Sequence, residues 1–148
     1  MGIIDVAAVI EKNGKFLLVQ EAQEICKGKW DIPGGLLDPN ETIFDGVKRE
    51  VFEECGCKVE VSGVLNIANR VLNDNTFIGI VFATKLIEEN INFDPKEILD
   101  VKWFTYEEIV NMKEKLRSSD WIINSISAAK ENKISDINMV KLLSGGLS

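Results

Sequence analysis

Residues 35–57 read GLLDPNETIFDGVKREVFEECGC, and this stretch decides the fold. Apolar residues recur in its second half every four positions, at Ile43, Val47 and Val51. Such a repeat predicts a helix with one apolar stripe facing a core. Thr42 is placed to cap the start of this helix, and Gly56 is placed to end it in a left-handed conformation.

The same helix carries an acidic face. Glu50, Glu53 and Glu54 stand at positions i, i+3 and i+4, so their carboxylates project from one side. Like charges this close favour a hard cation with oxygen ligands, although a solvated acidic surface is the alternative. Two features favour the metal site: the helix dipole disfavours acids at a C-terminal end, and a flexible Pro-Gly-Gly segment at residues 33–35 precedes the helix.

The stretch resembles the Nudix hydrolase signature, Gly-x5-Glu-x7-Arg-Glu-U-x-Glu-Glu-x-Gly-U, in which U is a bulky apolar residue. The residues in register are Gly35, Glu41, Arg49, Glu50, Val51, Glu53, Glu54 and Gly56. Cys57 departs mildly at the last position, because it is apolar but small.

Composition narrows the range of functions. The chain has 148 residues, a net charge of −7 and no basic run, which favours a small ligand over long nucleic acid. It has no histidine, so Ser-His-Asp triads and His-ligated zinc sites are excluded. No apolar run is long enough to span a bilayer, and three cysteines without zinc-type spacing indicate reduced thiols. We therefore expect a cytoplasmic protein that does not bind membranes.

The rest of the chain predicts one α/β domain over residues 1–148, with a mixed sheet and helices on both faces. Strands are expected at residues 3–10, 15–20, 30–32, 59–72, 77–86 and 98–104, with a bend or bulge in the fourth. Asn13-Gly14 predicts a hairpin turn. Polar loops are expected at 21–29 and 88–96, helices at 105–116, 120–130 and 135–143, and a frayed end at Gly145-Gly146. The resemblance implies the Nudix α/β/α sandwich for this arrangement.

The resemblance also implies an activity: Mg²⁺-dependent hydrolysis of a phosphoanhydride in a nucleoside diphosphate derivative, with Mn²⁺ as a substitute ion. Carried over residue by residue, the metal ligands are Glu53, Glu54, Glu50 and the carbonyl of Gly35. Arg49 and Glu41 are expected to pair and to hold the glycine loop. Homodimers are common in the family.

The general base is left open. Glu50 and Glu53 are candidates within the signature. Glu97, six residues before Trp103, stands where many members carry a further carboxylate, and a solvated loop glutamate explains it equally well.

Residues outside the signature suggest a substrate. The segment from Leu17 to Val51 is similar to the branch that hydrolyses oxidised guanine nucleotides such as 8-oxo-dGDP. That branch places an aspartate that reads the base near Asp120, although a helix N-terminus also favours an acid there. Residues that either stack on a base or belong to the core are Phe77, Phe82 and Trp121.

Three alternatives remain from the sequence. The first is an ADP-ribose or nucleotide-sugar pyrophosphatase with the same chemistry. The second is an isoprenyl diphosphate isomerase, which ranks low because that branch uses histidine ligands. The third is a non-catalytic module that senses a nucleotide, but such modules commonly lose the acidic residues that this chain keeps.

Overall fold

The computed structural model describes residues 2–144. The strands are β1 Gly2–Val9, β2 Glu11–Lys12, β3 Lys15–Glu21, β4 Trp30–Asp31, β5 Gly34–Leu36, β6 Cys57–Leu72, β7 Asn75–Glu89, β8 Ile98–Thr105 and β9 Ser135–Asp136. The α-helices are α1 Ile43–Cys55, α2 Tyr106–Asn111 and α3 Ser119–Lys130. Short 3-10 turns cover Glu24–Cys26, Lys113–Lys115 and Ile137–Met139.

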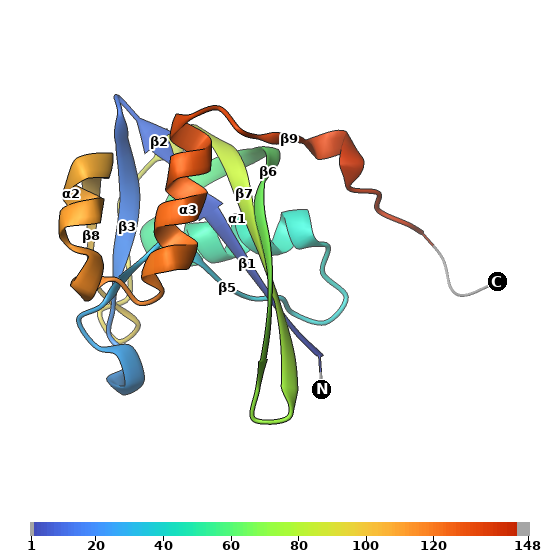
Figure 1. The fold of residues 1–148 in the computed structure, drawn as a ribbon, viewed down its shortest axis with the longest axis horizontal. Coiled ribbons are helices and arrows are strands. Elements are labelled where there is room, and N and C mark those ends of the chain that lie inside the picture. Colours follow the sequence, from blue (N-terminus) through green and yellow to red (C-terminus); the bar gives the residue numbers. More distant parts are fainter. Residues whose placement is uncertain (1, 145–148) are drawn as a thin grey trace.

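The strands form two sheets. One has the order β5-β1-β7-β6-β9 and is mixed, because β1 and β7 run parallel while its other pairs are antiparallel. The other joins β2, β3 and β4, with β8 on the free side of β3. In Figure 1, α1 lies behind the strands and α3 lies in front of them. The predicted α/β sandwich with a mixed central sheet is confirmed.

Alternating side chains of β1 and β3 supply two cores, one for each face. The core around α1 contains Val6, Ala8, Leu17, Val19, Val47, Val51, Cys55 and Phe82, among others. The core under α2 and α3 contains Ala7, Val9, Phe16, Leu18, Trp30, Ile109, Ile122 and Ile126, among others. Because both faces of the strands are buried, the strands read as continuous apolar runs rather than as alternating patterns.

The signature helix begins and ends where its capping residues predict. The Thr42 hydroxyl accepts a hydrogen bond from the Asp45 backbone N–H at 3.1 Å. At the other end Gly56 has φ +78°, and its N–H donates to the Phe52 carbonyl at 2.9 Å. These caps fix the register of the helix, and therefore the side from which its carboxylates project.

The turn at Asn13-Gly14 and the irregular long strand are also confirmed. Both turn residues have positive φ, and Lys12 pairs with Lys15 across the turn. β6 shows three register shifts against β7, between residues 58 and 66. Beyond them the β6–β7 hairpin projects below the body of the molecule in Figure 1.

One predicted helix begins at its predicted capping box, Thr105 to Glu108, but is too short, and another predicted helix is wrong. The helix expected at 105–116 stops at Asn111, because Leu116 forms a parallel bridge to Trp30 and draws the chain toward β4. The helix expected at 135–143 is a two-residue strand, β9, followed by a 3-10 turn. Pairing with β6 at residues 63–64 and packing of Ile137 and Val140 on the α1 core override local helix propensity there.

The loop boundaries differ in smaller ways. Glu21 belongs to β3 and is buried, although we expected it in a polar loop. β7 continues to Glu89, into the second expected loop. The frayed end expected at Gly145-Gly146 lies outside the described residues.

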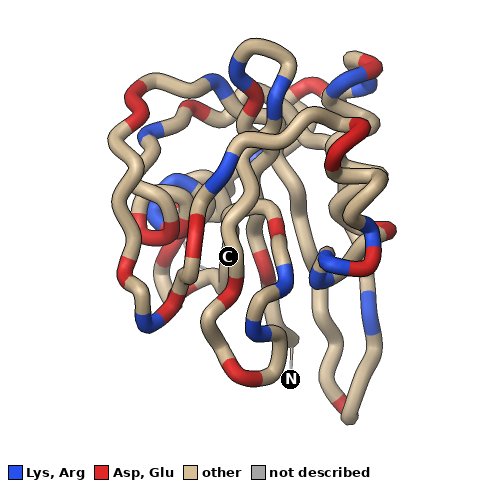
Figure 2. The backbone as a smooth tube through the Cα atoms, turned by 90° about the vertical axis from the view of Figure 1, so that its left-hand side faces the viewer, with Lys and Arg blue, Asp and Glu red and all other residues tan. Residues whose placement is uncertain are grey.

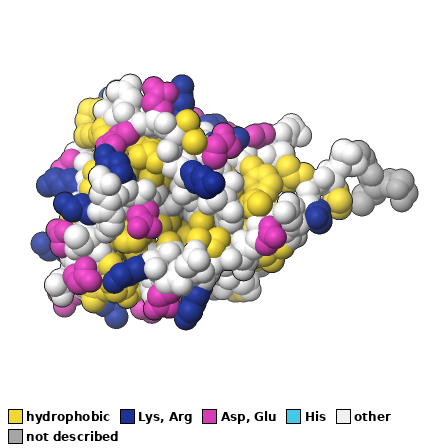
Figure 3. All heavy atoms as spheres, turned by 90° about the horizontal axis from the view of Figure 1, so that it is seen from above, with side chains coloured by type: hydrophobic (Ala, Val, Ile, Leu, Met, Phe, Trp, Pro, Cys, Tyr) yellow, Lys and Arg dark blue, Asp and Glu magenta, His cyan; other side chains and the backbone are white. Residues whose placement is uncertain are grey.

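Charge is dispersed over the molecule. Figure 2 shows basic residues interspersed with acidic ones along the backbone, and Figure 3 shows the same mixture on one face. Neither view has the continuous basic stripe that long nucleic acid requires. Among the helices of residues 2–144, none has the length and apolarity to cross a membrane.

Gly56→Ala tests the cap of α1. A Cβ at Gly56 would collide with the backbone oxygen of Asn90, whereas a Cβ at Gly14, where φ is +75°, meets nothing within 4 Å. Gly14→Ala should lower the free energy of unfolding by about 1 kcal/mol through backbone strain alone. Gly56→Ala should lose about 1–3 kcal/mol more in urea unfolding, because the collision adds to that strain. Equal losses in the two variants would contradict this packing of the helix end.

Candidate active site

The glycine loop lies directly on the acidic face of α1. The Gly34 N–H donates to Oε1 of Glu54 at 2.7 Å. A Cβ on Gly35 would lie only 2.5 Å from a carboxylate oxygen of Glu50, so only glycine fits between the loop and the helix. The loop and the helix therefore form one unit.

Arg49 binds this unit together. Its guanidinium donates to both oxygens of Glu41, at 2.7 and 2.9 Å, and to the Leu36 carbonyl at 3.2 Å. The same group donates to Glu50 at 2.8 Å and to Glu53 at 3.1 Å. The predicted pairing of Arg49 with Glu41 and with the glycine loop is thus present. These hydrogen bonds also lower the pKa of Glu41.

The three helix carboxylates differ in environment. The Glu53 side chain is 55% exposed, that of Glu50 is 16% exposed, and Glu54 is half-buried. Burial raises the pKa of Glu54 to about 9, and the neighbouring carboxylates Glu21, Glu50 and Asp31 contribute to this rise. A bound cation would relieve this repulsion, so the donor set fits a hard ion with oxygen ligands.

These carboxylates do not converge on one point. Within residues 2–144 no three acidic or thiol side chains are close enough to enclose an ion. The hydrogen bonds explain the spread, because Glu50 and Glu53 turn toward Arg49 while Glu54 turns toward Gly34. The predicted ligands thus share one face of α1, and their side chains would have to rotate to share an ion.

Three further acids surround this face, and no role was predicted for any of them from the sequence. They are Asp5 of β1, Glu21 of β3 and Asp31 of β4. Burial raises the pKa of all three, to about 6 for Asp5 and about 7 for Asp31. The signal that could have found them is an acid close to a buried apolar strand residue, since Val6, Val19 and Trp30 are all in the core.

Glu97 lies at the margin of the acid cluster. It is exposed, and its backbone carbonyl accepts a hydrogen bond from the Ala22 N–H at 3.0 Å. Its charge contributes to the raised pKa of Glu21, which in turn acts on Glu54. The structure therefore brings Glu97 near the site, where Glu21 stands between it and Glu54 of the helix.

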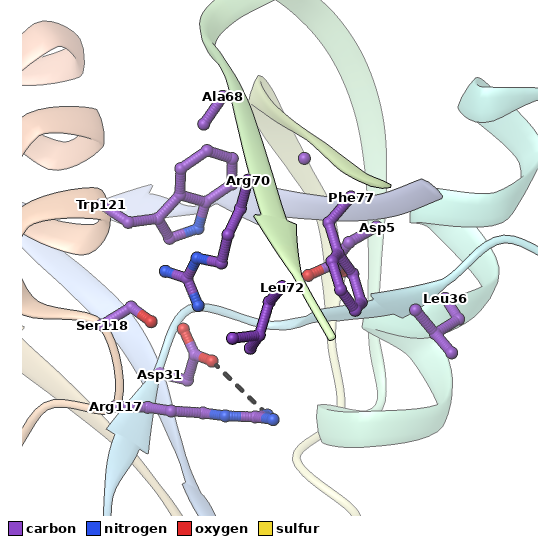
Figure 4. A pocket seen from close by; sticks show the side chains of 11 residues that line it. Asp5, Asp31, Leu36, Ala68, Arg70, Leu72, Phe77, Arg117, Ser118 and Trp121 are labelled. Atoms are coloured by element: carbon purple, nitrogen blue, oxygen red, sulfur yellow. Dashed lines mark ion pairs between the residues drawn. The ribbon is translucent and has the colours of Figure 1, made fainter. Parts of the chain in front are cut away.

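A pocket of about 270 Å³ opens beside the glycine loop. Figure 4 shows Trp121 and Arg70 on one side, Phe77 and Leu36 on the other, and Asp31 with Arg117 below them. A Cβ on Gly79 would lie 2.6 Å from the indole ring, so glycine at this position makes room for Trp121. The volume is near the lower end for ligand sites, roughly 300 Å³, and two aromatic walls suit a planar group.

The structure does not bring Asp120 to this pocket. Its side chain is 90% exposed and lies 3.9 Å from the Lys113 ammonium, on the outer side of α3. The next residue, Trp121, points into the pocket instead. Of the aromatic candidates, Phe77 and Trp121 line the pocket, while Phe82 is fully buried in the core against Phe44.

Comparison with known proteins decides the family. Residues 3–124 match the NUDIX domain family. The chain belongs to the Nudix family. It is 36% identical over 106 residues to the human protein "Nucleoside diphosphate-linked moiety X motif 6", covering 69% of this chain and 34% of that protein. It is 31% identical over 98 residues to the human "8-oxo-dGDP phosphatase NUDT18", covering 66% of this chain and 30% of that protein.

Solved Nudix structures agree in architecture. A NUDIX hydrolase from Nitrosomonas europaea superposes with a TM-score of 0.87 at 25% identity, covering 99% of this chain and 100% of that one. A MutT protein from Methanosarcina mazei Go1 gives 0.74 at 31% identity, covering 89% and 96% of the two chains. The chain spans about a third of the length of the human relatives.

Asp31 gives a pH-dependent test of the acid cluster. Its pKa rises from the ordinary value of 3.8 to about 7 in the folded protein, so its contribution to stability is full at low pH and is lost as the pH rises to about 7. Asp31→Asn cannot ionise. The difference in unfolding free energy, variant minus wild type, should therefore increase between pH 4 and pH 8. It is measured by urea unfolding with a chelator present.

Asp120→Asn is the matched control, because it removes the same charge from a 90% exposed site. It should follow the pH dependence of the wild type. A difference between Asp31→Asn and wild type that stays constant with pH would show that Asp31 is not a buried acid.

Proposed function

We propose that this chain is a Mg²⁺-dependent hydrolase that cleaves the phosphoanhydride of a nucleoside diphosphate derivative and releases a nucleoside monophosphate. The observation that carries the proposal is the glycine loop held on an acidic helix face, with an aromatic pocket beside it. The pocket would take the nucleoside, and the acidic face would take the diphosphate together with its cation.

The residues that would hold the cation are Glu50, Glu53, Glu54 and the Gly35 carbonyl, with Mn²⁺ as a substitute for Mg²⁺. A bound divalent ion supplies charge neutralisation for the phosphates and a water of lowered pKa. Arg49 and Glu41 hold the Gly35 loop against the helix, so the backbone ligand is in place before the substrate arrives.

A carboxylate must take the proton from the attacking water, since the chain has no histidine. Glu53 is the most exposed of Glu50, Glu53 and Glu54, and within residues 2–144 its one ion pair is with Arg49. Glu50 is tied more closely to Arg49, and Glu97 stands at the margin of the acid cluster. We assign the base to one of these three, with Glu53 first.

For the substrate, we propose an oxidised purine nucleotide. The support is the human relative named 8-oxo-dGDP phosphatase together with the pocket walls, Trp121 and Phe77, which suit a purine ring. In this pocket Asp31 takes the base-reading role that we expected for Asp120, because Asp31 lines the pocket and Asp120 does not. With this substrate, the protein would act in nucleotide pool sanitation, which is the removal of oxidised nucleotides. The three cysteines are free and buried, which fits a cytoplasmic location.

Glu53→Gln and Glu54→Gln test the assignment of the metal ligands. Each variant keeps the shape of the side chain, and the amide oxygen that replaces a carboxylate oxygen of Glu54 can still accept the Gly34 N–H, so both proteins should fold. With Mg²⁺ each should lower kcat by about two orders of magnitude or more, because a ligand charge is lost. Glu60→Gln, an exposed glutamate on β6 outside the site, is the control and should retain wild-type turnover. Wild-type kcat in both ligand variants would contradict the site.

A substrate panel tests the reaction itself. Phosphate and pyrophosphate release should be measured with Mg²⁺ on normal and 8-oxo-guanine nucleotides, ADP-ribose, nucleotide sugars and dinucleotides. We expect the highest kcat/KM for an oxidised guanine nucleotide. A preference for ADP-ribose or a nucleotide sugar would refute the substrate but keep the chemistry. Saturable binding without turnover on any compound would refute the hydrolase and leave a sensing module.

A further inference from the structure

Arg117 lies between the pocket and the acid cluster, and its backbone is fixed by β4. Its N–H donates to the Trp30 carbonyl at 2.9 Å, and the preceding Leu116 forms a parallel bridge with Trp30. The helix expected at 105–116 stops early because of this pairing. The pairing anchors the main chain of Arg117 beside Asp31, whichever side chain residue 117 carries.

The Arg117 guanidinium is shared by two nearly buried carboxylates. It lies 3.5 Å from Oε1 of Glu21, whose side chain is 9% exposed, and 4.0 Å from Oδ2 of Asp31, whose side chain is 19% exposed. The two acids come from neighbouring paired strands, β3 and β4. Buried carboxylates without a cation are strongly unfavourable, so this arginine favours the ionised form of both.

The geometry leaves part of Asp31 free for a ligand. Oδ1 accepts the Ile32 backbone N–H at 2.8 Å. Oδ2 lies too far from Arg117 for a direct hydrogen bond but close enough for charge attraction. In Figure 4 the dashed line joins Asp31, which lines the pocket, to Arg117. An ionised carboxylate only accepts hydrogen bonds, so Asp31 can serve a ligand in this pocket as an acceptor.

We propose that Arg117 is a positioning residue for base selection: it holds Asp31 as a fixed, ionised acceptor, and the pocket thereby selects bases with adjacent N–H donors. The edge of guanine, with its ring N1–H and 2-amino group, has this pattern. Adenine presents a ring acceptor there and is repelled. This inference rests on the proposed hydrolase function and specifies its substrate as a guanine-type purine.

Of the charged groups around Asp31, Arg117 is the one that can keep this carboxylate ionised. Glu21, Asp5 and Glu54 are acids and oppose the ionisation of Asp31. Arg70 lines the same pocket from the projecting hairpin, but among the described residues Asp31 pairs with Arg117 and not with Arg70. Arg117 is the cation whose backbone is tied to β4, so its charge stays next to Asp31.

The test compares Arg117→Gln, Arg117→Lys and wild type on GDP, IDP and ADP with Mg²⁺ at pH 8, measuring kcat and KM separately. IDP keeps the N1–H and lacks the 2-amino group. For the wild type we expect GDP to be preferred over IDP and IDP over ADP in kcat/KM. Arg117→Gln should raise KM for GDP by about tenfold or more, because Asp31 would no longer be held as a charged acceptor for the hydrogen bonds of the base, and should leave kcat within about twofold. Arg117→Lys should recover part of the preference, because it returns the charge.

Lys113→Gln is the matched control. It removes a cation from the same segment, where Lys113 pairs with exposed Asp120 outside the pocket, and it should keep wild-type values of kcat and KM. Unchanged GDP-to-ADP selectivity in Arg117→Gln would overturn the inference, as would equal losses for all three nucleotides. A wild-type enzyme without guanine preference would overturn it as well. Absence of turnover on any nucleotide in the wild type would instead refute the proposed function, so the two failures are distinct.

Discussion

The site depends on one guanidinium. Arg49 donates to Glu41, Glu50, Glu53 and the carbonyl of Leu36 in the glycine loop. Without it, a helix that carries acids at its C-terminal end would face unfavourable repulsion and an unfavourable dipole. With it, the loop is fixed to the helix by charge-assisted hydrogen bonds whose geometry only an arginine fork provides. The Arg49 side chain thus both positions the glycine loop and neutralises part of the negative charge on the helix.

The fold buries several acidic side chains close together, an arrangement that lowers the stability of the folded protein. Asp5, Glu21, Asp31 and Glu54 come from four different elements and are all at least partly buried, and burial raises the pKa of each. Such a cluster costs folding free energy, and Arg117 offsets part of that cost on the pocket side. Perturbed acids gathered in a cleft are typical of functional sites. The cost is understandable if a cation and a polyanionic substrate complete the charge balance.

Local chemistry made part of this structure predictable. The bounds of the signature helix could be predicted because its caps, Thr42 and Gly56, act through contacts with residues a few positions away. The pairing of Arg49 with Glu41 followed from a long, specific motif. The hairpin at Asn13-Gly14 followed from two positive φ angles that these residue types tolerate.

Where distant contacts decide, the sequence was insufficient. The bridge of Leu116 to Trp30 shortened α2, and pairing with β6 turned residues 135–136 into a strand. The base-reading acid was expected one residue before Trp121, but the phase of α3 points the tryptophan inward and Asp120 outward. The helix phase depends on how Ile122 and Ile126 pack, and only the assembled core fixes it.

The role of Arg49 is tested most directly by the turnover of Arg49→Lys with Mg²⁺ on the best nucleotide of the panel. Lysine keeps the positive charge but cannot reach Glu41, Glu50 and the loop carbonyl together. If the fixed loop matters, kcat should fall by about 10–100-fold in a variant that remains folded. A kcat within twofold of the wild type would show that charge alone suffices, and it would contradict the central role of the arginine fork.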